Sequence, residues 1–174
     1  MENTGDIELM QMTAEGSLAA FETLVDRYQQ KMLNYFLRMG VNTDGEDLVQ
    51  ETFVKLYRSR LRYRPTAKFR TYLYTIARSV WIDRVRKSDR QSRLKEAMGE
   101  EADTQLPAPA TDQHLDVREA LGLLPERLRS VVVLSVFEGM RYHEIADILE
   151  IPEGTVKSRM HTAMNQLRVL LDEK

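Results

Sequence analysis

The sequence predicts an all-α protein made of two small helical domains joined by a flexible acidic linker. Apolar residues recur at helical spacing along most of the chain, whereas the alternating pattern of strands is nearly absent. A length of 174 residues suits one ordinary domain or two small ones. Residues 88–113 lose the helical pattern and combine clustered acids with prolines, as flexible linkers do. We therefore place the domains at residues 1–90 and 114–174, with the linker at 91–113.

The first domain should contain three helices. Ser17 is a suitable N-cap for a helix that ends at Gly40. Residues 43–46 have the form of a capping box, a threonine followed three residues later by a glutamate, which predicts the start of a second helix. Pro65 breaks the next connection, and a long helix is expected at about residues 66–87.

That long helix combines aromatic and basic side chains. At about 100° per residue, Phe69, Leu73, Ile76 and Val80 form a narrow core stripe, and Arg78 points nearly opposite. The flanks carry Tyr74 and Trp81 on one side, and Tyr72, Ser79 and Arg86 on the other. The three flanking rings are expected at half-buried margins, where a ring can meet a base, and the pattern does not choose among them.

In the second domain, helical patterning returns at His114. Pro125 predicts the first position of a helix that closes at Gly139. Two more helices are expected at about residues 142–150 and 152–171, with a tight turn between them. A further helix is expected before Pro125, where Leu115, Val117, Ala120, Leu121 and Leu124 recur at helical spacing.

The last two helices form a predicted helix-turn-helix. Ala146 and Val156, ten residues apart, fit the small and apolar positions where such helices cross, although Glu150 stands where glycine is common. The second helix would enter the major groove with its first turns, and an ordinary helical hairpin is the alternative. Its outward side chains can contact phosphates or base edges: Thr155, Lys157, Ser158, Arg159, His161 and Thr162.

Charge is divided unevenly along the chain. The formal net charge is −2, but residues 55–95 carry 14 basic and 2 acidic side chains, a net +12, between acidic segments. A basic block of this size is the electrostatic footprint of a nucleic-acid-binding surface, and a solvated basic face is the plainer alternative.

The composition argues against several other classes of protein. The absence of cysteine removes disulfides, thiolate metal ligands and cysteine nucleophiles. The three histidines are scattered, and the zinc pattern H-E-x-x-H at residues 143–147 ends in Asp147 instead of histidine. We therefore expect no metal, no cofactor, no small-molecule substrate and no enzymatic activity. No apolar run approaches the roughly 18 residues of a membrane span, and the acidic N-terminus does not resemble a signal peptide, so we expect a cytoplasmic protein without membrane insertion.

Four motifs, in order, resemble a bacterial RNA polymerase sigma factor of the extracytoplasmic-function type, group 4 of the sigma-70 family. AAFETLVDRYQQKMLNYFLR resembles the start of the family's first domain, and EDLVQETFVKLYR resembles the segment that docks on the polymerase clamp. FRTYLYTIARSVWIDRVRK resembles the promoter-melting segment that reads the minus-ten element. LPERLRSVVVLSVFEGMRYHEIADILEIPEGTVKSRMHTAMNQLR resembles the domain that reads the minus-thirty-five element.

The resemblance implies a fold, partners and site residues. The domains would be a region 2 helical bundle and a region 4 helix-turn-helix domain, binding core RNA polymerase (β′ clamp and β flap), promoter DNA and an anti-sigma factor. A flipped minus-ten base would be read in a pocket formed by residues 61–68 and the next helix. The implied polymerase-binding residues are Asp47, Gln50, Glu51 and Val54. The implied minus-ten residues are Tyr63, Lys68, Arg70, Tyr72, Tyr74, Arg78, Ser79, Trp81 and Arg86. The implied minus-thirty-five residues are Arg141, Thr155, Lys157, Ser158, Arg159, His161 and Thr162.

Two departures from the family limit what the resemblance carries over. Many relatives have tryptophan where this chain has Tyr72, and asparagine where it has Ser79. The promoter sequence is therefore not implied. The main alternative is a stand-alone helix-turn-helix regulator that uses only the second domain. An enzyme would need a titratable cluster that the sequence lacks, and a structural adaptor would leave the basic block without a purpose.

Overall fold

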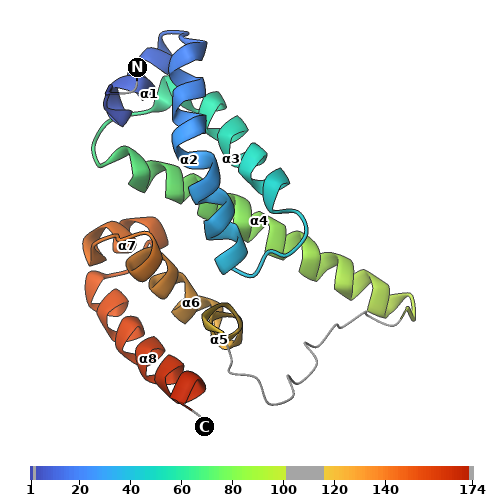
Figure 1. Cartoon of the computed structure of the whole chain (residues 1–174). Coiled ribbons are helices and arrows are strands. Elements are labelled where there is room, and N and C mark those ends of the chain that lie inside the picture. Colours follow the sequence, from blue (N-terminus) through green and yellow to red (C-terminus); the bar gives the residue numbers. More distant parts are fainter. Residues whose placement is uncertain (2, 101–115, 173–174) are drawn as a thin grey trace.

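The computed structural model describes residues 1, 3–100 and 116–172 (Figure 1). The N-terminal domain comprises α1 (Asp6–Ala14), α2 (Leu18–Arg38), α3 (Gly45–Arg58), the short helical turn η1 (Arg60–Arg62) and α4 (Phe69–Ala97). The C-terminal domain comprises α5 (Val117–Leu123), α6 (Glu126–Val132), the π-helical turn η2 (Val133–Phe137), α7 (Tyr142–Leu149) and α8 (Glu153–Asp172). Every regular element in these residues is helical, which confirms the predicted fold class.

Helix α2 is the centre of the N-terminal domain and packs against both α1 and α3. Ser17 caps it as predicted, because its hydroxyl accepts a hydrogen bond of 3.2 Å from the Ala20 amide. At the other end Gly40 has φ +98°, and the amides of Gly40 and Val41 donate back to carbonyls of the last turn. Gly40 therefore ends α2 in the left-handed conformation, as the sequence predicts.

The start of α3 differs from the predicted capping box. Asp44, not Thr43, is the N-cap residue, so Glu46 falls one position too early to complete the box. The Asp44 carboxylate makes no cap hydrogen bond; instead it accepts two hydrogen bonds from Arg84 of α4. A tertiary ion pair has replaced the local cap.

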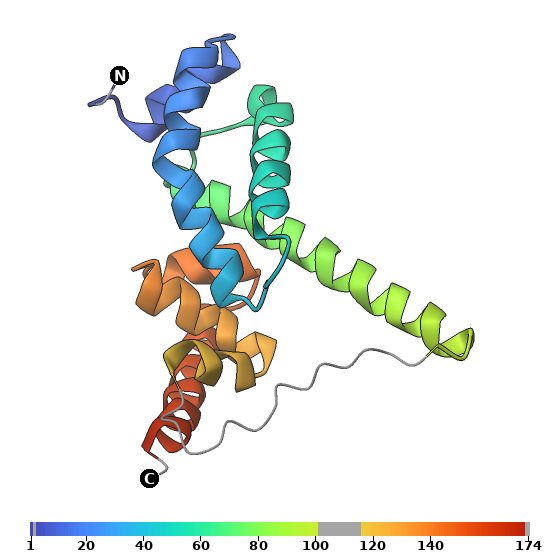
Figure 2. The same cartoon turned by 45° about the vertical axis from the view of Figure 1, so that its right-hand side comes forward.

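Helix α4 is longer than predicted, continuing from Lys87 to Ala97 and so into residues assigned to the linker. Residues 91–100 are all exposed, and Figures 1 and 2 show this end of α4 projecting away from the rest of the molecule. Apolar periodicity gave no signal here, since strong helix formers such as Gln91, Arg93 and Leu94 stabilise an exposed helix without a core. The remainder of the predicted linker lies outside the described residues, and the domain boundaries stay a prediction. Sequence reasoning also did not predict α1.

The C-terminal domain contains the predicted helices with two local differences. The capping box of α5 joins Asp116 and Glu119, and Pro125 is the N-cap of α6 rather than its first helical residue. The helix-turn-helix is formed by α7 and α8, with Val156 fully buried and Ala146 packed against the core. Its turn passes through Glu150 at φ 54° and ψ 46°, the left-handed conformation that usually calls for glycine.

The two domains lie against each other. Helix α7 packs on the first half of α4, and α5 approaches the end of α2 (Figures 1 and 2). No helix in the described part of the chain is long and apolar enough to cross a membrane.

Candidate polymerase and nucleic-acid interfaces

The predicted polymerase-binding residues form one exposed face of α3. Asp47, Gln50 and Glu51 are exposed, and the Val54 side chain is 47% exposed although it is apolar. Glu51 pairs loosely with Lys55 at 3.7 Å, which leaves its carboxylate accessible. The structure therefore brings all four predicted residues together on a surface that a partner can reach.

An apolar cleft of about 550 Å³ lies beside this face, between α2 and α3. Gln50 and Val54 form one edge, and the rings of Phe21, Phe53 and Tyr57 line the wall. Phe21 is the centre of the aromatic group, with its ring centroid 5.0 Å from that of Tyr57 and 6.4 Å from that of Phe53. A helix carrying apolar and polar side chains fits such a surface.

Among the predicted minus-ten residues, Tyr63 and Tyr72 form an aromatic cluster with Phe69. Their ring centroids are 5.0 Å apart, and that of Tyr63 is 6.4 Å from that of Phe69. The Tyr72 hydroxyl shares a hydrogen bond of 2.6 Å with Ser59, and Tyr72 is half-buried as predicted. Burial raises the pKa of the Tyr63 hydroxyl, which is enclosed and has no hydrogen-bond partner among the described residues.

The half-buried margin predicted for Tyr74 and Trp81 is wrong. Tyr74 is 2% exposed and Trp81 is 7% exposed, and both belong to the core. Tyr74 packs edge-on against Tyr35, with ring centroids 5.4 Å apart, and its hydroxyl donates to the Glu138 carboxylate of the C-terminal domain. The pattern of one helix could not reveal the burial of Tyr74, because part of its cover comes from the other domain.

The predicted minus-ten residues of α4 lie on two separate faces. Tyr72, Ser79 and Arg86, spaced every seventh residue, share what we call the open face, and Ser79 and Arg86 are exposed. Lys68, at the start of the helix, is 62% exposed. The junction face consists of Arg70, Tyr74 and Arg78, which are spaced every fourth residue and point toward the C-terminal domain.

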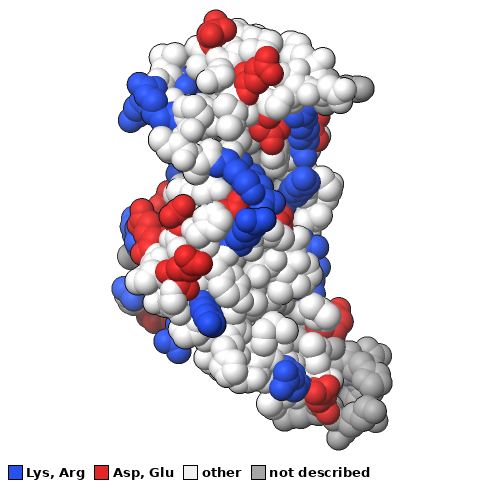
Figure 3. Space-filling model, turned by 90° about the vertical axis from the view of Figure 1, so that its left-hand side faces the viewer, with Lys and Arg blue, Asp and Glu red and all other residues white. Residues whose placement is uncertain are grey.

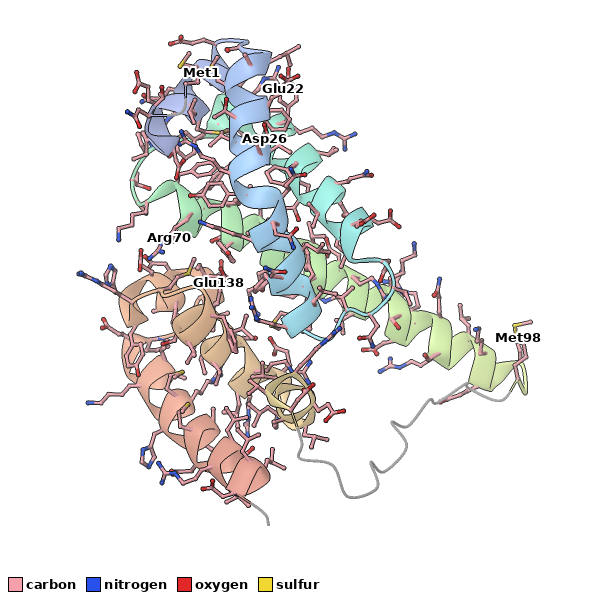
Figure 4. All side chains as sticks on the ribbon, viewed as in Figure 1. Met1, Glu22, Asp26, Arg70, Met98 and Glu138 are labelled. Atoms are coloured by element: carbon pink, nitrogen blue, oxygen red, sulfur yellow. The ribbon has the colours of Figure 1, made fainter. Side chains whose placement is uncertain are left out.

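Each residue of the junction face contacts a carboxylate of the C-terminal domain. Arg70 Nη2 lies 3.2 Å from Glu144 Oε2, and Arg78 Nη1 lies 3.0 Å from Glu126 Oε1. Tyr74 donates to Glu138, and Figure 4 shows Arg70 and Glu138 where the two domains meet. Lysines and arginines lie next to aspartates and glutamates at mid-height of the face in Figure 3. Sequence reasoning assigned none of these three glutamates to a site, since no motif indicates that they face α4.

The three carboxylates differ in their electrostatic environments. Burial acts to raise the pKa of Glu126, but hydrogen bonds from Ser130 and Arg78 outweigh it, so that pKa lies below 4.5. The pKa of Glu144 is also lowered, because the Arg141 amide and Arg70 overcome the effect of burial. Burial dominates at Glu138 and raises its pKa despite the hydrogen bond from Tyr74.

Helix α8 presents most of the predicted minus-thirty-five residues to solvent. Lys157, Ser158, His161 and Thr162 are exposed, and so is Arg141 at the start of α7. Thr155 and Arg159 are half-buried, and the charge of Arg159 is close enough to contribute to the low pKa of Glu126. The exposed hydroxyls bond within the helix and can exchange that bond for a phosphate or base.

No group of three or more potential metal-binding side chains occurs within residues 1, 3–100 and 116–172. His143, the first residue of the near-zinc motif, is exposed on α7.

Comparisons with known proteins cover both domains. The sequence profile for "Sigma-70 region 2" matches residues 24–91, and that for "Sigma-70, region 4" matches residues 114–167. The chain is 30% identical to the ECF RNA polymerase sigma-E factor of Haemophilus influenzae, with 95% of each chain covered. It is 34% identical to the ECF RNA polymerase sigma factor SigW of Bacillus subtilis, covering 88% of this chain and 90% of SigW.

Solved structures agree with the sequence comparisons. CnrH, in complex with the cytosolic domain of CnrY, superposes with a TM-score of 0.74 at 29% identity, covering 96% of this chain and 97% of CnrH. The sigma factor RpoE of Bartonella quintana, in complex with the anti-sigma factor NepR, superposes with a TM-score of 0.73 at 25% identity, covering 88% of this chain and 98% of RpoE.

Proposed function

This chain belongs to the extracytoplasmic-function sigma factors of the sigma-70 family and directs RNA polymerase to promoters through regions 2 and 4; on that premise we propose which surfaces bind each partner. It is a specificity subunit and not an enzyme. Its partners include core RNA polymerase and promoter DNA, which makes the cytoplasm its place of action.

The α3 face formed by Asp47, Gln50, Glu51 and Val54 binds the clamp coiled coil of the polymerase β′ subunit. The observation that carries this proposal is an exposed apolar side chain, Val54, beside exposed acids and the aromatic cleft. The acidic side chains orient the partner and speed association, whereas the cleft supplies the apolar area that is buried in the complex. The C-terminal domain contributes the contact with the β flap.

The open face of α4, with Lys68, holds the non-template strand of the minus-ten element. Tyr72 is the ring placed to stack on a base, because it is half-buried, fixed by Ser59 and beside the loop before α4. Stacking on such a ring contributes about 1–3 kcal/mol per base. Arg70, Tyr74 and Arg78 reach the strand only in part while the C-terminal domain covers the junction face, and Trp81 supports the helix from the core.

Helix α8 reads the minus-thirty-five element in the major groove. Lys157, Ser158, His161 and Thr162 are exposed along its first turns, where such helices contact bases. Arg141 and Arg159 contact phosphates on either side. The two DNA elements are held by separate domains, so their modest affinities combine through effective concentration.

An anti-sigma factor regulates this chain. Two solved relatives, CnrH and RpoE, were captured with CnrY and with the anti-sigma factor NepR, and the similarity extends over most of this chain.

The clamp assignment is tested with the double substitution Asp47→Ala/Gln50→Ala. Affinity for core polymerase, measured by fluorescence anisotropy of labelled protein, should fall about tenfold, equivalent to about 1.4 kcal/mol. The matched control Asp26→Ala/Gln11→Ala removes the same chemical groups from exposed positions on α2 and α1 and should not change affinity. Equal affinities for both double variants would rule out the α3 face.

A further inference from the structure

The junction face of α4 meets a row of carboxylates instead of solvent. Arg70, Tyr74 and Arg78 are one helical turn apart, about 6 Å along the axis. Their partners come from three different elements: Glu144 lies in α7, Glu138 follows η2, and Glu126 is the first residue of α6. Three matched contacts from three elements require that the whole domain is docked in one register.

The contacts are partly protected from water. The Glu144 side chain is 3% exposed and the Glu138 side chain 9%, while Arg78 is 19% exposed. Lys68 Nζ also lies 3.4 Å from Glu144 Oε1, so this carboxylate pairs with two cations. The other partners in these pairs are more accessible, since Arg70 is 31% and Glu126 40% exposed. Partly buried ion pairs of this kind are less screened by salt than surface pairs, and they occupy the cations that other anions could bind.

Two further links clamp the same junction. Arg129 of α6 donates to the Met39 carbonyl of the N-terminal domain at 3.0 Å. Arg38 stacks over the Phe137 ring at 4.4 Å and lies 3.7 Å from Glu138. These links involve no residue proposed to bind DNA, so they stabilise docking independently of the DNA surface.

We infer that the C-terminal domain is an internal competitor for nucleic acid: the carboxylates of Glu126, Glu138 and Glu144 occupy the cationic junction face that a DNA strand uses when the domains separate. This inference rests on the proposed function of α4. A nucleic-acid strand also presents a series of anions, and guanidinium groups bind carboxylate and phosphate with the same geometry. One set of side chains cannot hold both.

The competition sets a threshold for DNA binding. Only the open form can place Arg70 and Arg78 on phosphates, so the apparent affinity for DNA is the intrinsic affinity multiplied by the fraction of molecules that are open. If about 90% of the molecules are closed, the apparent affinity is about tenfold lower. Burial raises the pKa of Glu138, which indicates that docking holds this carboxylate in an unfavourable environment and that release into water recovers part of its hydration.

The test uses full-length protein with the isosteric substitutions Glu126→Gln, Glu138→Gln and Glu144→Gln combined. The chain has no native cysteine, so Glu22→Cys and Gln166→Cys, both exposed, carry a donor and an acceptor dye on the two domains. The triple variant should shift the transfer-efficiency distribution toward separated domains. Its affinity for a single-stranded 20-nucleotide DNA, measured by anisotropy, should rise about tenfold.

A charge-matched control separates competition from simple repulsion. Asp147→Asn, Glu153→Gln and Asp172→Asn together remove three exposed acids of the same domain that make no ion pair with α4 among the described residues. This control should leave the distance unchanged and raise DNA affinity by much less. The inference would be overturned if the two triple variants gained equally in DNA affinity, or if the distance between the dyes did not change in the glutamate variant. It would also be overturned if neither variant bound DNA.

A charge swap tests the docking register directly. Glu126→Arg alone should separate the domains, and adding Arg78→Glu should bring them back to the closed distance. Failure of that rescue contradicts the pairing. Run-off transcription by wild-type protein with core polymerase tests the proposed function separately. If promoter-dependent product forms but the glutamate substitutions do not change the distance between the dyes, only the internal competitor is refuted. If the distance changes but no product forms, only the proposed function is refuted.

Discussion

Arg84 of α4 binds Asp44, the N-cap residue of α3, through hydrogen bonds of 2.5 and 3.0 Å. The pair ties the start of one helix to the middle of another, across 40 residues of sequence. The hydrogen bond from Arg84 holds the pKa of the Asp44 carboxyl below its ordinary 3.8, although burial opposes the shift. This contact therefore positions α3, which carries the proposed polymerase-binding face.

Replacing Arg84 by glutamine should destabilise the N-terminal domain modestly. Both side chains are about one-third exposed, so we expect a loss of about 0.5–1 kcal/mol in the free energy of unfolding. Because the folded pKa of Asp44 is depressed, this contribution is complete well above pH 3.8 and disappears as the pH falls through the folded pKa. Urea unfolding at pH 6 and pH 3 measures both effects.

The probe for that experiment is already in the chain. Trp81 is the single tryptophan and lies in the N-terminal core, so its fluorescence reports this domain. Asp44→Asn should give a similar loss at pH 6, and the double variant should lose little more than either single variant. Additive losses would show that the two side chains do not interact.

The same pair shows why local sequence signals have limits. Ser17 and Gly40 were predicted correctly as helix ends, because each acts through its own backbone neighbourhood. The capping box at residues 43–46 was predicted by the same kind of rule and is wrong, since Arg84 binds the adjacent Asp44 from a distant helix. A signal read over four residues fails where a tertiary contact competes with it.

Site prediction shows the same division. The exposed faces of α3 and α8 follow from helical spacing, and their predicted residues lie together. Spacing also placed Arg78 opposite the core of its own helix. It could not show that Glu126 covers that side, because the two residues are 48 positions apart and belong to different domains. The roles of the individual site residues stay predictions.

A second prediction concerns Glu150, the only non-glycine residue with positive φ in the described part of the chain. A left-handed backbone costs a residue with a side chain about 1–2 kcal/mol. Glycine removes this strain but offsets part of the stabilisation, because it increases the conformational entropy of the unfolded chain. Glu150→Gly should therefore stabilise the C-terminal domain by about 0.5 kcal/mol. Hydrogen exchange of the α7 and α8 amides measures the change, and Glu150→Ala, which keeps the strain, should show no gain.

A third prediction compares two neighbouring tyrosines. Burial raises the pKa of both Tyr35 and Tyr74, but only Tyr74 has a hydroxyl partner, Glu138. The Tyr35 hydroxyl is buried without a partner among the described residues, so Tyr35→Phe should be neutral or slightly stabilising. Tyr74→Phe removes a hydrogen bond to Glu138 across the junction and should cost about 1 kcal/mol. Thermal unfolding followed by circular dichroism ranks the two variants; equal effects would contradict the assignment.

The last prediction uses two glycines with almost the same backbone. Gly16 has φ +101° and Gly40 has φ +98°, so alanine at either position should be strained by about 1 kcal/mol. Their surroundings differ: a Cβ on Gly40 would lie 3.0 Å from Arg129 Nη1, whereas nothing lies within 4 Å of one on Gly16.

Arg129 cannot move freely away from that Cβ. It donates to the carbonyls of Leu121, Gly122 and Leu124 as well as to Met39 of the N-terminal domain. The bond to Met39 is the one that crosses the junction, so it is the one that a displaced guanidinium would lose. Gly40→Ala should therefore separate the dye-labelled domains more often than Gly16→Ala, at a similar cost to the N-terminal domain reported by Trp81 fluorescence. The same degree of separation in both variants would mean that the Arg129 link does not help to hold the domains closed.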